Sequence, residues 1–200
     1  MTKLDEGSLT GLLQRDVTIR VVEPHILSVF SNDETGNSYD DKFGTMYDLV
    51  ACNPIYNRLI WGYSTAKFPL VVEKVLQARS DGFVLDIGCG ALAFTAGIYS
   101  RYRERPVILV DQSLKLLRLA KARLIKLNGA VPENMIFVHA DAMQLSFVPK
   151  SFSTIIVLNL LHVLPDIVRA NSQIKGGISS KNEGTLRQRP LSIREVSLVI

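Results

Sequence analysis

The sequence predicts an α/β fold with a doubly wound, mostly parallel sheet. Short apolar runs alternate with longer amphipathic segments from residue 83 onward, which is the pattern of successive βαβ units. The apolar runs are continuous rather than alternating, as expected of strands that are buried on both faces. The first run stops at a pair of glycines, where the backbone can turn tightly.

The individual elements follow from periodicity and from stop signals. We expect parallel strands at 83–87, 107–110, 135–139 and 153–158, and helices at 68–78, 94–102 and 113–127. The last helix should end at Asn128-Gly129. Its leucines recur at core-facing spacing, so its basic residues are expected to form a solvated face. These residues are Lys115, Arg118, Lys121 and Arg123.

The chain divides into three predicted parts. Residues 1–45 are a partly irregular N-terminal extension with a short strand expected at 17–22, and residues 46–82 are a helical cap rich in aromatic side chains. Residues 83–200 form the ligand-binding domain. After Leu164 only 36 residues remain, which is room for one helix and a strand around 196–200.

Composition excludes several classes of protein. The net charge is +4, but the last 36 residues contribute +3 of it, so a solvated polar tail explains the basic balance at least as well as a nucleic-acid surface does. The two cysteines have no metal-ligand spacing, and no metal site is expected. The N-terminus has no secretory pattern and no apolar stretch is long enough to span a membrane, which indicates a cytoplasmic protein.

Polar residues and glycines gather where the predicted strands end. In an open parallel sheet, ligands bind beyond the carboxyl ends of the strands. Carboxylates at three consecutive strand ends would be costly to desolvate without a partner. The residues at these ends are Asp86, Gly88, Cys89, Gly90, Asp111, Asp141, Ala142, Asn159 and His162.

This pattern favours a nucleoside-type cofactor. The glycines allow close approach of the backbone, and Asp111, 21 residues after Gly90, is placed to receive both ribose hydroxyls. Asp141 could accept from an adenine amino group and the Ala142 N–H could donate to a ring nitrogen, while Asp86 lies near a cationic end of the ligand. Residues 88–93 also satisfy the dinucleotide pattern, so NAD stays open as an alternative.

Four segments resemble the successive motifs of class I S-adenosylmethionine (SAM)-dependent methyltransferases. They are VLDIGCGALAFT (84–95), LVDQSLKLLRLA (109–120), FVHADAMQLSF (137–147) and FSTIIVLNLLHVLPD (152–166). The resemblance is closest to the small-molecule branch, similar to quinone-biosynthesis C-methyltransferases, and residues 47–68 resemble the helical cap of that branch.

The resemblance implies a Rossmann-like domain that binds SAM and methylates a small molecule. The implied cofactor-binding residues are Asp86, Gly88, Cys89, Gly90, Asp111, Gln112, Asp141, Ala142 and Asn159. His162 is the candidate general base or substrate-steering residue. His139, inside a strand, is expected to be structural.

Two departures from the family pattern define a rival hypothesis. Leu92 stands where the family usually has a third glycine, and it is expected to restrict the backbone and to crowd the methionyl end of the ligand. The short C-terminal region implies that the last strands of the family sheet are missing. A degenerate, non-catalytic domain would fit both departures, and an exposed sheet edge would then favour a homodimer or a hetero-complex.

A second motif points to nucleic acid but is less consistent with its context. Asn53-Pro54-Ile55-Tyr56 resembles the Asn-Pro-Pro-Tyr element of amino-methylating enzymes that act on adenine or glutamine. In those enzymes it ends a strand of the sheet, whereas here it precedes the glycine loop by about 30 residues. We therefore expect the aromatic residues of this region to pack in the cap, and a nucleic-acid substrate is disfavoured.

Overall fold

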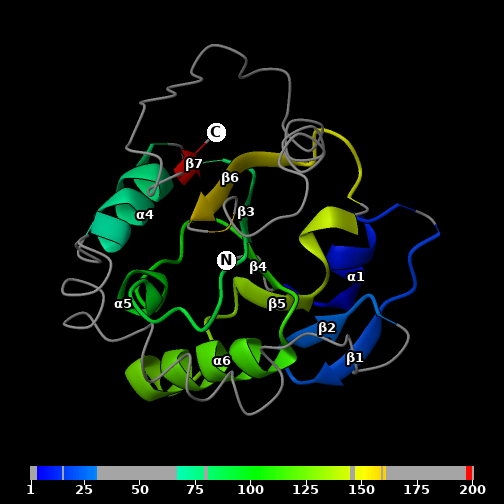
Figure 1. Ribbon diagram of the computed structural model, residues 1–200, viewed down its shortest axis with the longest axis horizontal. Helices are drawn as coiled ribbons and strands as arrows, with labels where there is room; N and C mark the ends of the chain where they lie inside the picture. The colour runs from blue at the N-terminus through cyan, green and yellow to red at the C-terminus, as the bar shows by residue number, and fades with distance from the viewer. Residues whose placement is uncertain are drawn as a thin grey trace.

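The computed structural model describes residues 4–14, 16–30, 67–78, 81–144, 147–158, 160 and 197–199. They form a seven-stranded sheet in the order β1-β2-β5-β4-β3-β6-β7 (Figure 1). The strands are β1 (Arg20–Glu23), β2 (Ile26–Ser28), β3 (Phe83–Ile87), β4 (Val107–Asp111), β5 (Met135–His139), β6 (Phe152–Leu158) and β7 (Ser197–Val199).

The sheet is mostly parallel, as the sequence predicts. Strands β2, β5, β4, β3 and β6 pair with one another in parallel, and only the outermost pairs, β1 with β2 and β6 with β7, are antiparallel. In the sheet, β4 and then β5 lie on one side of β3, and β6 lies on its other side, so the strand order reverses at β3. This reversal is the point at which ligands bind in doubly wound sheets.

Helices cover both faces of the sheet. Figure 1 shows α4, α5 and α6 along one side and α1 on the other. Because successive side chains of a strand point to opposite faces, Leu109 packs in the α4–α6 cluster while its neighbour Ile108 packs in the α1 cluster. The helices are α1 (Glu6–Thr10), α4 (Lys67–Gln77), α5 (Ala96–Tyr99), α6 (Leu114–Asn128) and the 3-10 turn η2 (Ala142–Gln144).

Local signals explain the ends of α6. The Ser113 hydroxyl accepts a hydrogen bond from the Leu116 amide at 3.2 Å and caps the first turn. Gly129 ends the helix with a left-handed φ of 77°, which a glycine adopts at little cost. The predicted start and stop of this helix are confirmed. Helix α5 is shorter than the predicted 94–102.

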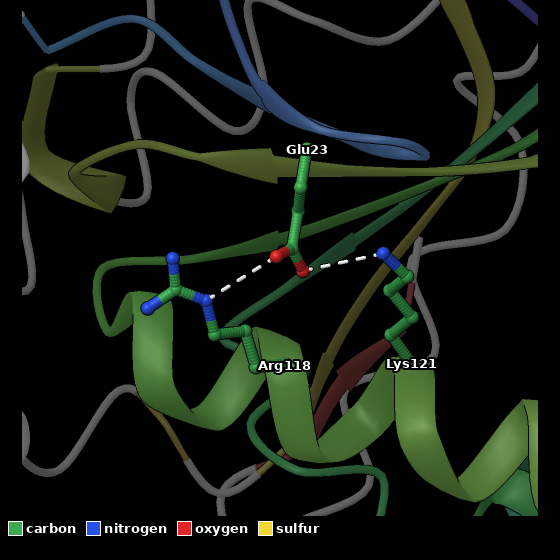
Figure 2. A network of polar contacts seen from close by, with 3 residues as sticks. All are labelled: Glu23, Arg118 and Lys121. Carbon is green, nitrogen blue, oxygen red and sulfur yellow. Dashed lines mark hydrogen bonds and ion pairs between the residues drawn. The ribbon is translucent and has the colours of Figure 1, made fainter.

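The N-terminal extension contributes two strands to the sheet rather than the single strand expected at 17–22. β1 and β2 form a hairpin around Pro24 and His25, and β2 pairs in parallel with β5. The Glu23 carboxylate then lies between two cations of α6, with Lys121 at 3.2 Å and Arg118 at 3.6 Å (Figure 2). The hairpin is thereby attached to both the sheet and a helix.

The prediction that the basic residues of α6 form a solvated face is partly wrong, because the hairpin packs beside this helix. The Lys121 side chain is only 17% exposed, whereas Arg118 is 52% exposed. Sequence periodicity places both on the polar side of the helix but does not reveal that a hairpin from residues 20–28 packs beside it.

Both outer positions of the sheet are occupied by short strands. β7 confirms the strand expected around 196–200 and pairs with residues 156–158 of β6. The absence of further family strands stays a prediction, as does the division at residues 45 and 82. In the part of the chain described here, no helix is long and apolar enough to cross a membrane.

Candidate cofactor site

A tight loop follows β3 and turns the chain at the carboxyl edge of the sheet. The amides of Gly88 and Cys89 both donate to the Val110 carbonyl, at 2.8 and 3.0 Å, which ties the loop to β4. Gly88 and Gly90 have left-handed φ values of 71° and 56°. Among the described residues, a Cβ added at Gly90 would meet no atom within 4 Å, while one at Gly88 would lie 2.8 Å from a methyl of Leu160. The loop backbone is therefore open at Gly90 and covered at Gly88.

Asp111 joins this loop to the end of β4. One carboxylate oxygen accepts from the Gly90 amide at 2.8 Å and the other accepts from the Ser113 amide at 2.9 Å. The side chain is partly buried. Two backbone donors on different segments fix the orientation of the carboxylate, so the acidic group and the glycine loop form one unit.

Asp86 lies below the loop and is only 3% exposed. The Tyr99 hydroxyl donates to its carboxyl group at 2.6 Å. Burial raises the pKa of Asp86 to about 7; the Tyr99 hydrogen bond opposes this shift and the nearby Asp111 charge adds to it. Burial also raises the pKa of the Tyr99 hydroxyl well above its usual range. Asp86 is therefore a carboxyl group that can change its protonation state near neutral pH.

Asp141 begins the turn that follows β5. β5 pairs with β4 as far as Asp111, so the two strands end at the same edge. One Asp141 carboxylate oxygen accepts from the Met143 amide at 2.8 Å and the other from the Gln144 side chain at 3.4 Å. Asp141 thus caps η2, and Ala142 packs against the α1-side core.

Gln112 completes the corner after Asp111. Its side chain is exposed, and its carbonyl lies 3.0 Å from Nε2 of the buried His139. Asn159 and the candidate base His162 lie outside the described residues. So do residues 46–66, including the Asn53-Pro54 element and the aromatic residues of the cap. Expectations about these positions stay predictions.

Leu92 does not crowd the open side of the loop. Its φ of 53° is left-handed, the conformation that explains a glycine at this position in the family pattern. Its side chain is 2% exposed and belongs to the hydrophobic cluster that contains Ala96 and Tyr99. The expectation of a restricted backbone is supported, while the expected crowding is wrong because the side chain is part of the core.

Two residues of the site have no signature in the amino-acid sequence. Tyr99 reaches Asp86 from α5, and the Arg123 guanidinium donates to the Ala91 carbonyl in the glycine loop. The expectation that Arg123 simply faces solvent is wrong. Both contacts join residues on different elements, and neither residue belongs to a motif, so no local signal identifies them.

The described ranges hold no group of three or more His, Cys, Asp or Glu side chains arranged to bind a metal ion. The described residues at this edge offer carboxyl groups, backbone amides and an open loop. Such a set binds a polar organic ligand that carries hydroxyl or amino donors.

Comparison with known proteins agrees with this geometry. Residues 84–176 match the family described as Methyltransferase domain. No curated protein sequence matches the chain. One of the solved structures that share the fold contains S-adenosylhomocysteine, the demethylated form of the cofactor that the sequence predicts.

Several solved structures share the fold. A candidate S-adenosyl-L-methionine-dependent methyltransferase from Methanococcus maripaludis is 15% identical, with a TM-score of 0.56, over 76% of this chain and 64% of its own. Phosphoethanolamine N-methyltransferase 2 of Haemonchus contortus, solved with phosphomonomethylethanolamine and S-adenosylhomocysteine, is 21% identical, with a TM-score of 0.50, over 74% and 32%. The cyclase SpnF is 18% identical, with a TM-score of 0.51, over 69% and 56%.

This chain therefore spans less than two thirds of each of these three proteins. At such identities the likeness shows the fold and not the reaction, and one of the three is named as a cyclase. Residues 84–176 are therefore similar to a methyltransferase domain, and the described part of the chain has the Rossmann-like α/β fold that these solved structures share.

Proposed function

We propose that this protein is a SAM-dependent methyltransferase that transfers a methyl group to a small-molecule acceptor. Its motifs resemble those of the branch of the family that methylates small molecules. The observation that carries the proposal is the Asp111 carboxylate, held by the Gly90 and Ser113 amides beside an open glycine loop. A carboxylate fixed in this way presents a preformed acceptor to a pair of ribose hydroxyls.

The residues at this edge fit an adenosine linked to an amino acid. The open side of Gly90 allows a ligand to approach the backbone closely. The buried Asp86, with a pKa near 7, suits a cationic amino group, because a positive neighbour favours the charged form of a carboxyl. The Leu160 side chain covers Gly88, so we assign the approach to the Gly90 side of the loop.

The remaining roles extend this assignment along the edge. We propose that Asp141 and Ala142 bind the adenine ring, and that the loop from Gly88 to Gly90, together with Gln112, contacts the rest of the cofactor. Asn159 is assigned to the same binding set. His162 is proposed to act on, or to orient, the methyl acceptor.

Bound SAM supplies an electrophilic methyl group on a sulfonium, so the protein needs no strong nucleophile of its own. Its residues have to bind the cofactor, orient it and exclude water. Asp111 and Asp86 do the first two by accepting hydrogen bonds at two separate points of the ligand. The cap predicted at residues 46–82 would exclude water from the acceptor.

The test is a calorimetric titration of the full chain with SAM and with S-adenosylhomocysteine. We expect binding by the wild type, and a loss of about 10-fold to 100-fold in affinity for Asp111→Ala, because a charged hydrogen-bond acceptor is removed. Asp111→Asn should bind with intermediate affinity, since its amide keeps one acceptor oxygen.

The matched control is Glu133→Gln, which neutralises an exposed carboxylate just before β5, at the opposite edge of the sheet. Its affinity should equal that of the wild type. A folded wild-type protein that shows no heat with either ligand contradicts the proposal. Thermal protection by NAD but not by SAM would favour a dehydrogenase instead.

A further inference from the structure

A chain of hydrogen bonds runs from the N-terminal hairpin to the corner at Asp111. The Phe30 amide donates to the Ser28 hydroxyl at 3.1 Å, and Ser28 Oγ lies 3.1 Å from Nδ1 of His139. On the other side of the ring, Nε2 lies 3.0 Å from the Gln112 carbonyl. Ser28 and His139 are fully buried. These hydrogen bonds therefore link residues 28–30 to the segment that contains Asp111, the proposed cofactor-binding carboxylate.

The proton positions in this chain follow from its two ends. The Gln112 carbonyl can only accept, so Nε2 of His139 must carry the hydrogen. In a neutral imidazole Nδ1 is then an acceptor, and it receives the Ser28 hydroxyl proton. The Ser28 oxygen in turn accepts from the Phe30 amide. All donors point in one direction, toward Gln112.

The last bond of the chain controls the orientation of the Asp111 carboxylate. The Gln112 carbonyl and the Ser113 amide belong to the same planar peptide unit, in which C=O and N–H point in opposite directions. His139 holds the carbonyl end, and the amide end donates to Asp111 at 2.9 Å. A donor at His139 thus directs the Ser113 N–H toward the carboxylate.

The hairpin also fixes the histidine ring itself. β2 pairs with β5 so that Ser28 faces His139, and the Val29 amide donates to the His139 carbonyl at 3.1 Å. The Phe30 ring contacts the imidazole edge-on, with 4.7 Å between ring centroids. These contacts fix the position of the ring.

We propose that Ser28 and His139 are positioning residues for the cofactor, which hold the Gln112–Ser113 peptide so that Asp111 is presented to the ligand. This inference rests on the proposed function and adds to it. Ser28 lies before residue 84, where the methyltransferase domain match begins, so a segment outside that match contributes to the site.

The test compares S-adenosylhomocysteine binding by calorimetry in four full-length variants. We expect His139→Leu, which removes the donor to Gln112, to bind about tenfold more weakly than the wild type. His139→Gln keeps an N–H donor and should recover part of the affinity. Ser28→Ala should weaken binding by about threefold, since Nδ1 of the ring loses the hydroxyl that donates to it and the ring is held less firmly.

Thr154→Val is the matched control because Thr154 is also a buried hydroxyl on a strand, but it binds Arg105 at the other end of the sheet. It should lower the melting temperature and leave the affinity unchanged. Equal affinity of wild type, His139→Leu and Ser28→Ala would overturn the inference while leaving the proposed function intact. A wild type that binds no cofactor would remove both.

A second measurement observes the protonation of the His139 ring directly. The chain has three histidines, so ¹⁵N spectra of the ring nitrogens can be assigned with His25→Gln and His162→Gln. In the wild type we expect His139 to be protonated at Nε2 and not at Nδ1. In Ser28→Ala, we expect an increased Nδ1-protonated fraction. A wild-type ring protonated at Nδ1 alone would overturn the inference.

Discussion

The Tyr99 hydroxyl donates a 2.6 Å hydrogen bond to the Asp86 carboxyl, and both groups are buried beneath the glycine loop. Burial favours the neutral acid, which places the pKa of Asp86 near 7. The Tyr99 hydroxyl stabilises the ionised form but does not overcome this effect. Two consequences can be measured, one for stability and one for binding.

The first prediction concerns stability as a function of pH. The pKa of Asp86 is higher in the folded protein than in the unfolded chain. Between about pH 4 and pH 7 the folded protein therefore keeps a proton on Asp86 that the unfolded chain has already released. The contribution of Asp86 to the free energy of unfolding is fully present below pH 4. It is lost as the pH rises to 7, by an amount on the order of a few kcal/mol.

Urea denaturation at a series of pH values tests this. Relative to Asp86→Asn, the wild type should lose stability from pH 4.5 to pH 7.5 and show little further change above. Tyr99→Phe removes the bond that favours the ionised form, so its profile should extend to higher pH. Parallel profiles of wild type and Asp86→Asn would contradict the prediction.

The second prediction concerns proton release on cofactor binding. If the amino group of the cofactor lies near Asp86, its positive charge lowers the pKa of the carboxyl in the complex. At pH 6 binding should then release a proton, and affinity should rise as the pH increases from 5.5 to 7.5. Calorimetry in buffers of different ionisation enthalpy measures the released proton directly. Asp86→Asn should bind without this release.

The third prediction concerns Leu92, whose left-handed φ of 53° carries a buried side chain. Truncation removes core packing and should cost about 2–5 kcal/mol. Alanine retains the backbone strain, about 1–2 kcal/mol, whereas glycine relieves it. We therefore expect Leu92→Gly to be more stable than Leu92→Ala, which is the reverse of their usual order in regular secondary structure.

Chemical denaturation of both variants checks this order. The loop should also remain competent to bind cofactor in Leu92→Gly, because the lost side chain belongs to the core rather than to the open face. A Leu92→Ala variant that is the more stable of the two would show that the backbone changes conformation at this position.

Much of the central sheet could be predicted from the sequence because each strand has a local signal. The bounds of β3 and β5 agree with the prediction, since continuous apolar runs are interrupted by glycine, proline or polar residues. The two central carboxyl residues, Asp86 and Asp111, follow from their places at strand ends. Their proximity needs only the rule that parallel strands end at one edge.

What could not be predicted depends on contacts between distant segments. β2 has only three residues and exists by pairing with β5, more than a hundred residues later. The Tyr99–Asp86 bond and the Ser28–His139 contact likewise join different elements. Such contacts leave no periodic pattern in the sequence, because each element contributes only one residue to the contact.

The last prediction concerns Arg105, which is 1% exposed and, among the described residues, donates its hydrogen bonds to neutral oxygens. Its guanidinium donates to the carbonyls of Leu76 and Asp81 and to side-chain hydroxyls. These hydroxyls belong to Tyr102, Ser153 and Thr154. Arg105 thus joins the end of α4, the turn before β3 and the start of β6, at the edge opposite the cofactor site.

Replacing Arg105 should therefore lower stability without changing cofactor affinity in the folded protein. Arg105→Gln leaves several buried acceptors without a donor and should lower the free energy of unfolding by about 3 kcal/mol. Arg105→Lys should also destabilise, because one ammonium group does not reproduce the fork of donors. The exposed neighbour Arg101 supplies the control, with Arg101→Gln expected within about 0.5 kcal/mol of wild type. Wild-type stability of Arg105→Lys would mean that charge alone, and not the geometry of the guanidinium, joins these segments.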